Sequence, residues 1–112
     1  MKKLASVCAS VLLLLSTSVF AEKSSIEQAL GHANEAVTHG KAGHTPLLLE
    51  HAKAALEDAL AASIVAKGVS KNHLDAGAKE LQEAIDHGTM GHVGVATTHA
   101  EAAVEHIKAS KK

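Results

Sequence analysis

Three short breaks that contain glycine divide the chain beyond residue 24 into four alanine-rich segments, and the breaks lie at residues 39–44, 67–70 and 87–92. Glycine is common just past the end of a helix, because it adopts the left-handed conformation without steric strain. The only proline, Pro46, follows Thr45 as a first-turn proline follows an N-cap residue. The pattern predicts helices over residues 25–39, 46–67, 70–87 and 93–109, with Gly40, Gly68 and Gly88 just past helix ends.

Apolar residues recur in these segments at steps of three and four, which is typical of helices that bury one stripe. In the second and third segments the predicted stripes are Leu49, Ala52, Leu56, Leu60 and Ile64, and Leu74, Ala78, Leu81 and Ile85. Short turns between helices favour antiparallel neighbours. We therefore expect an all-α fold, an antiparallel up-down-up-down four-helix bundle.

The chain also repeats itself at an offset of 48 residues. Residues 35–57 and 83–105 share 11 identities in 23 positions, and four of these lie in the turn from His39 to His44, which aligns with that from His87 to His92. Self-similarity at a fixed spacing indicates a repeated structural unit. The bundle is therefore predicted to consist of two duplicated helical hairpins.

Residues 1–21 have the three parts of a secretory signal peptide: Lys2 and Lys3, an apolar stretch over residues 4–15, and a small-residue exit at residues 19–21. Polar residues 16–18 end the apolar run before the roughly 20 residues that a membrane-spanning helix needs. We expect cleavage after Ala21, export, and no membrane insertion of the mature chain. Residues 22–112 then form a single domain.

Cleavage would remove Cys8 and Phe20, so the mature chain has no cysteine and no aromatic residue. It also has no arginine, and its nine lysines and twelve acidic residues give a formal charge of −3. A nucleic-acid binder normally shows a basic surface, so this class is excluded. Without cysteine the chain lacks thiolate metal sites and the haem-attachment motif, and it has no Gly-rich nucleotide-binding loop. We expect neither haem nor nucleotide.

The mature chain holds nine histidines, and most of them are spaced by five or seven residues. In an antiparallel hairpin, residues at the same height have a constant sum of residue numbers. That sum is 83 for His39 with His44 and for His32 with His51 in the first hairpin. It is 179 in the second hairpin, for His87 with His92, His73 with His106, and Glu80 with His99. Eight histidines are thus predicted to pair across a hairpin, and the ninth faces a carboxylate.

This arrangement indicates metal binding, since imidazole is the commonest metal ligand in proteins. All nine residues are candidate ligands: His32, His39, His44, His51, His73, His87, His92, His99 and His106. A carboxylate such as Glu35 or Glu50 would complete a site that two imidazoles leave open. The Irving–Williams order favours Cu(II), followed by Ni(II) and Zn(II). Cu(I) fits poorly, because Met90 is the only sulfur donor of the mature chain.

Three segments, residues 35–45, 49–53 and 91–100, resemble the small metal-binding protein family, and the likeness extends over nearly all of the mature chain. The resemblance implies a periplasmic, His-rich four-helix bundle that binds copper and other divalent ions. Its role would be to buffer, sequester or scavenge metal, with metal ions as its partners.

An enzyme is not expected. No glutamate is followed by histidine three residues later, as di-metal bundles require, and no His-Glu-x-x-His motif occurs. The alternative is a structural or interaction module of the cell envelope whose histidines sense pH. The spacing allows a monomer or a weak dimer bridged by metal.

Overall fold

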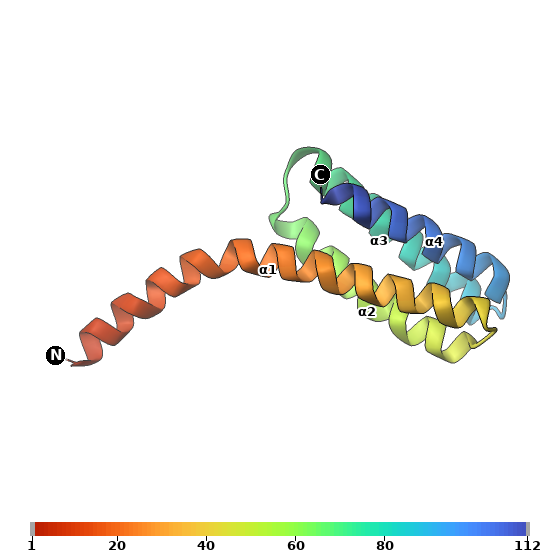
Figure 1. The fold of residues 1–112 in the computed structure, drawn as a ribbon, viewed down its shortest axis with the longest axis horizontal. Coiled ribbons are helices and arrows are strands. Elements are labelled where there is room, and N and C mark those ends of the chain that lie inside the picture. The colour runs from red at the N-terminus through yellow and green to blue at the C-terminus, as the bar shows by residue number, and fades with distance from the viewer. Residues whose placement is uncertain (1, 112) are drawn as a thin grey trace.

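The protein is described by a computed structural model that covers residues 2–111, with side chains from residue 22 onward. Over this range it consists of four helices, α1 (Lys2–Lys41), α2 (Thr45–Val65), α3 (Gly68–Thr89) and α4 (Val93–Ser110). Each packs against the helices before and after it in the chain, and α1 also packs against α4 (Figure 1). The all-α fold, an antiparallel up-down-up-down four-helix bundle, is confirmed.

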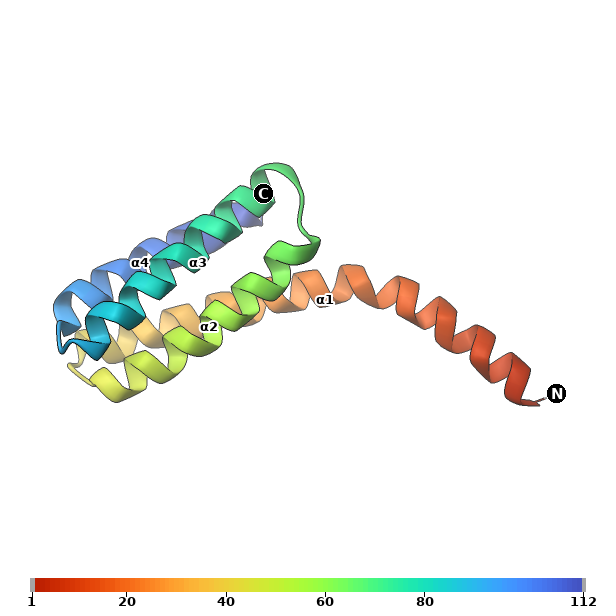
Figure 2. The same ribbon diagram turned by 180° about the vertical axis from the view of Figure 1, so that it is seen from behind.

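The first half of α1 extends away from the other three helices, as both views of the ribbon show (Figures 1 and 2). The predicted signal peptide, residues 1–21, lies outside the residues whose side chains the structure describes. Among the residues whose side chains are described, no helix is both long enough and apolar enough to cross a membrane.

The two hairpin turns have the same geometry and lie at the same end of the bundle. Gly43 and Gly91 have φ of 78° and 82°, so they occupy the left-handed region. The His44 amide donates to the His39 carbonyl at 2.8 Å, and the His92 amide donates to the His87 carbonyl at 2.8 Å. This six-residue bond closes a helix in the Schellman motif. The helix-ending glycines are therefore Gly43 and Gly91. The predicted helix ends at residues 39 and 87 were two residues short, since α1 ends at Lys41 and α3 at Thr89.

Gly40 and Gly88 lie in the last turns of α1 and α3, where the absence of a side chain lets residues of neighbouring helices pack close to the backbone. A Cβ on Gly40 would overlap the Thr97 hydroxyl and lie 2.7 Å from Leu48 Cδ1. At Gly88 it would lie 2.8 Å from Leu49 Cδ2. Sequence periodicity alone could not separate this use of glycine from helix capping. The predicted start of α2 was also displaced by one residue. His44 is the N-cap residue of α2, and Thr45, predicted as the N-cap, is already helical.

Alanine supplies most of the core. Fully buried leucine and isoleucine side chains are few, and the largest are Leu48, Leu74, Leu81 and Ile107. In α2 the buried stripe is Leu48, Ala52, Ala55, Ala59 and Ala62, and Ala66 just after the helix is also buried, whereas Leu60 and Ile64 are 48% and 81% exposed. The stripe predicted for α2 was wrong at these two positions, because the alanine stripe has the same helical spacing and lets the helices approach more closely.

The connection between the hairpins is short and is held by a polar network. Ala66 and Lys67 are extended, and Gly68, with φ of 61°, begins α3 instead of ending α2 as predicted. The Ser63 hydroxyl donates to the Asp75 carboxylate, and Lys71 Nζ donates to Ser63 Oγ at 3.0 Å. The hydrogen bond from Ser63 lowers the pKa of the Asp75 carboxyl, and Lys71 acts in the same direction. This network joins α2 to α3.

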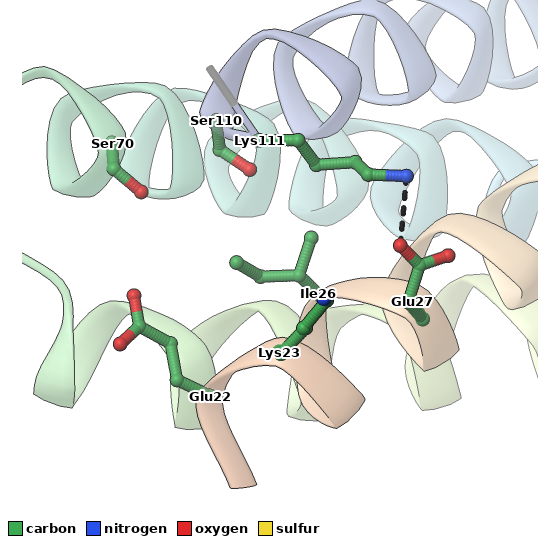
Figure 3. Close-up of a pocket in the computed structure, with 7 residues that line it drawn as sticks. All are labelled: Glu22, Lys23, Ile26, Glu27, Ser70, Ser110 and Lys111. Carbon is green, nitrogen blue, oxygen red and sulfur yellow. Dashed lines mark ion pairs between the residues drawn. The ribbon is translucent and has the colours of Figure 1, made fainter. Parts of the chain in front are cut away.

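The end of the bundle opposite the two hairpin turns contains a cavity of ≈250 Å³ between α1, α3 and α4 (Figure 3). Lys111 Nζ pairs with Glu27 at 2.7 Å at its edge, and Ile26 and Ser110 also line it. The ion pair ties the end of α4 to α1.

The helical glycines yield a prediction about stability. Gly40→Ala should destabilise the protein by about 1–3 kcal/mol, because the added methyl overlaps the rigid, β-branched Thr97. Gly31→Ala is the matched control: nothing lies within 4 Å of its Cβ position, so the better helix former should stabilise by about 0.5–1 kcal/mol. Urea unfolding followed by circular dichroism measures both. A Gly40→Ala protein as stable as the parent would contradict the close packing.

Candidate metal centre

The histidines lie on the flanks of the helices, between the alanine core and the solvent. The turn residues His44 and His92 are exposed, and the other seven side chains are half-buried, namely His32, His39, His51, His73, His87, His99 and His106. They occupy these flanks because a spacing of seven residues returns to nearly the same face of a helix. Half-burial leaves the ring nitrogens accessible to a small ion while it restricts the rings.

In the first hairpin, four imidazoles form one continuous row. His32 Nδ1 and His51 Nδ1 lie 3.3 Å apart, and the rings of His39 and His44 have centroids 5.7 Å apart. These are the two pairs that the constant sum predicts. The rings of His39 and His51 are also stacked, with centroids 5.3 Å apart and planes at 6°. His51 therefore contacts two histidines of α1, one on each side.

The second hairpin places its residues in the same way. The rings of His87 and His92 are 5.8 Å apart, and those of His87 and His99 are stacked at 5.3 Å and 7°. His73 Nδ1 and His106 Nδ1 lie 3.5 Å apart, toward the end of the bundle opposite the hairpin turns. His99 Nδ1 lies 2.7 Å from a Glu80 carboxylate oxygen. Every predicted cross-hairpin pair is thus in contact, while the role of these residues as metal ligands stays a prediction.

The stacked pairs, His39 with His51 and His87 with His99, were not predicted, and the direction of helical side chains explains them. Side chains lean toward the N-terminus of their own helix. In an antiparallel hairpin, His39 therefore leans away from the turn and His51 leans toward it. The two rings meet between their levels. A count of Cα heights alone misses this diagonal contact.

Two groups of three potential metal donors occur among the described residues. We call Glu35, His39 and His51 the first site, and Glu83, His87 and His99 the second site. Within each site the donor atoms all lie within 4.8 Å of one another. Donors bound to one ion at about 2.0–2.2 Å are no more than about 4 Å apart. Small rotations of the side chains would therefore bring all three onto a common ion.

Glu83 is the functional candidate that sequence reasoning missed. It lies 48 residues after Glu35, so the internal repeat could have identified it. Both carboxylates considered for the first hairpin are exposed, and of the two only Glu35 belongs to a three-donor group among the described residues. Glu35 and Glu83 each lie four residues before a histidine, one helical turn away.

The ring nitrogens of the two sites are oriented alike. His39 Nε2 lies 3.8 Å from Glu35, and His87 Nε2 lies 3.9 Å from Glu83. His87 Nδ1 is buried and has no hydrogen-bond partner among the described residues. Its accessible nitrogen is therefore Nε2, which faces the carboxylate. In both sites the nitrogen of the α1 or α3 histidine points at the oxygen that would share an ion with it.

Asp58, on α2, is an acidic residue close to His32. Burial raises the pKa of its carboxyl, and the nearby His32 acts in the opposite direction. In the second hairpin, the counterpart of Asp58 is His106, 48 residues later, and it pairs with His73. His73 and His106 belong to no three-donor group among the described residues.

Comparison with known proteins identifies the family of the chain. A family model described as "Small metal-binding protein" matches residues 1–110, which is nearly the whole chain. Among the curated proteins, none matches the chain.

Proposed function

We propose that this chain, which belongs to the small metal-binding protein family, binds divalent transition-metal ions through the histidines of its two hairpins. The observation that carries the proposal is the presence of two equivalent sites, each with one glutamate and two histidines within 4.8 Å. Two imidazoles and a carboxylate form a donor set that zinc and other borderline ions accept in proteins. Each site leaves at least one coordination position for water.

Cu(II) is the preferred ion in this proposal, and Ni(II) and Zn(II) follow it. For a given set of nitrogen and oxygen donors, affinity rises along the Irving–Williams order to a maximum at Cu(II). Soft donors would favour Cu(I), but Met90 is the only sulfur-containing side chain among residues 22–111, and it belongs to neither site. Ca²⁺ and Mg²⁺ prefer sets of oxygen donors.

The proposed role is binding without catalysis. The two sites lie on open helix faces, where the His39 and His87 side chains are 24% and 27% exposed. No residue of either site lines the cavity of ≈250 Å³ at the end opposite the hairpin turns. None lines the second cavity, of ≈190 Å³, between α1 and α4. Catalytic centres are usually concave. The partial exposure of both sites gives an ion a path to and from the solvent, which suits buffering, sequestration or scavenging.

We place this activity in the periplasm. The support is the tripartite pattern of residues 1–21, with Lys2 and Lys3 before an apolar stretch and a small-residue exit that ends at Ala21. Among the described side chains, the buried apolar residues run from Ile26 to Ile107, so cleavage after Ala21 would retain all of them.

A titration of the metal-stripped protein with Cu(II) tests the proposal directly. We expect saturable binding of at least two ions, measured by isothermal titration calorimetry. The double variant His39→Ala, His87→Ala removes one imidazole from each site and should reduce the number of ions bound with high affinity.

The matched control is the double variant Asn34→Ala, Gln82→Ala, which changes one exposed residue in each hairpin and should bind like the parent. No saturable binding, or binding indifferent to both histidines, would refute the proposal and favour an interaction module with pH-sensing histidines.

Binding should also depend on pH, because an imidazole coordinates a metal only through an unprotonated nitrogen. The ordinary pKa of histidine is about 6.5, so protons compete with the ion below that pH. We expect the Cu(II) affinity to fall as the pH drops from 7.5 to 5, measured by titration in a non-coordinating buffer. Equal affinity at both pH values would show that the histidines are not the ligands.

Metal should stabilise the fold. Each site takes donors from both helices of its hairpin, so the ion should bind the folded state more tightly than the unfolded chain. At a free-ion concentration 100-fold above Kd, one site stabilises by about 2.7 kcal/mol. We expect Zn(II), which undergoes no redox change, to raise the melting temperature in circular dichroism, and Mg²⁺ to leave it unchanged. An unchanged melting temperature with Zn(II) would argue against sites that bridge helices.

A further inference from the structure

The two sites have the same donors but different neighbours. His51 and His99 occupy corresponding positions 48 residues apart, and so do His32 and Glu80, which contact them. His99 Nδ1 faces a carboxylate oxygen of Glu80 at 2.7 Å, whereas His51 Nδ1 faces His32 Nδ1 at 3.3 Å. The side chains of His99 and Glu80 are both 28% exposed, so the contact is partly shielded from water.

The neighbour of His99 determines which of its ring nitrogens is free. A carboxylate only accepts hydrogen bonds, so a neutral His99 must carry its proton on Nδ1 when it contacts Glu80. The lone pair is then on Nε2, which is available to an ion. A carboxylate in this position also fixes the ring orientation and makes the imidazole a stronger ligand.

His51 has no such constraint. Its neighbour is a second imidazole, which both donates and accepts hydrogen bonds, so either ring can carry the proton between the two Nδ1 atoms. When His51 accepts that bond, its own proton lies on Nε2 and blocks that nitrogen from an ion. The first site must therefore select one of two tautomers, whereas the second site has only one.

We propose that Glu80 is a positioning residue that makes the second site bind its ion more tightly, so that the second hairpin fills before the first. This inference rests on the proposed function. Loss of a carboxylate that orients a ligating histidine typically weakens metal binding 10–100-fold. The residue at position 80, and its counterpart at position 32, sets the difference between two otherwise equivalent sites.

The tautomer is measured first, on the metal-free protein. Long-range ¹H–¹⁵N correlation spectra at pH 8 distinguish a ring protonated on Nδ1 from one protonated on Nε2, and His99→Gln assigns the signal. We expect Nδ1–H for His99 in the parent and a mixture of tautomers in Glu80→Gln. A merely structural role of Glu80 would leave the tautomer unchanged. A mixture in the parent would overturn the inference.

Affinity is measured next, with one site present at a time. His39→Ala, His51→Ala retains the second site, and His87→Ala, His99→Ala retains the first. Competition titrations with Cu(II) should give 10–100-fold tighter binding for the second site. Glu80→Gln should abolish this advantage, and His32→Glu should tighten binding at the first site.

A gain of affinity in His32→Glu cannot arise from misfolding, so it tests the inference even if Glu80→Gln is unstable. The matched control is Glu105→Gln in the protein that retains the second site. It removes the same charge from a residue that pairs with Lys108 on the surface of α4, and it should not change the affinity.

The outcomes separate the two proposals. If neither single-site protein binds Cu(II) saturably, the proposed function fails. If both bind Cu(II) with equal affinity, and the substitutions at positions 32 and 80 change nothing, only the role of Glu80 is overturned.

Discussion

The close approach of the two helices in each hairpin is the constraint on which the site depends. An alanine side chain ends at Cβ, so a core lined by residues such as Ala52, Ala55, Ala100 and Ala103 allows neighbouring backbones to lie near each other. Imidazoles on the flanks of adjacent helices then reach across and stack with centroids 5.3 Å apart. Larger core residues would separate the helices and, with them, the donors. The same small residues bury little apolar surface, and under the proposed function bound ions would add stability that the core does not supply.

The hairpin turns fix the register in which the histidines meet. In each turn a glycine with positive φ closes the Schellman motif, and the next residue, His44 or His92, ends one helix and caps the following one. The motif often brings together the third-last helical residue and the residue after the glycine, usually as an apolar contact. Here those positions hold His39 with His44, and His87 with His92. A local rule of helix termination thereby places the first pair of each row.

The sequence predicts the helices and the cross-hairpin pairs because both follow from local rules, namely glycine breaks and a constant sum across a tight turn. It does not reveal which stripe of α2 is buried. The stripe with Ala59 and the stripe with Leu60 have the same helical spacing, and only packing against the other helices selects the one with alanine. Nor does it reveal that Gly40 permits close packing, which depends on Thr97 of α4. The diagonal contact between His39 and His51 needs the direction of the side chains as well as their order.

Duplication explains why the sites correspond, and divergence explains why they differ. The turns, the stacked rings and the Glu and His donors are retained in both hairpins. The neighbour at position 32 or 80 is not retained, although it contacts a donor ring directly. Two identical sites would respond to the same narrow range of free-ion concentration. Under the proposed function, sites that share their donors but differ in one hydrogen-bonded neighbour would respond over a wider range, so a single divergent residue would extend the ion concentrations over which the bundle buffers metal.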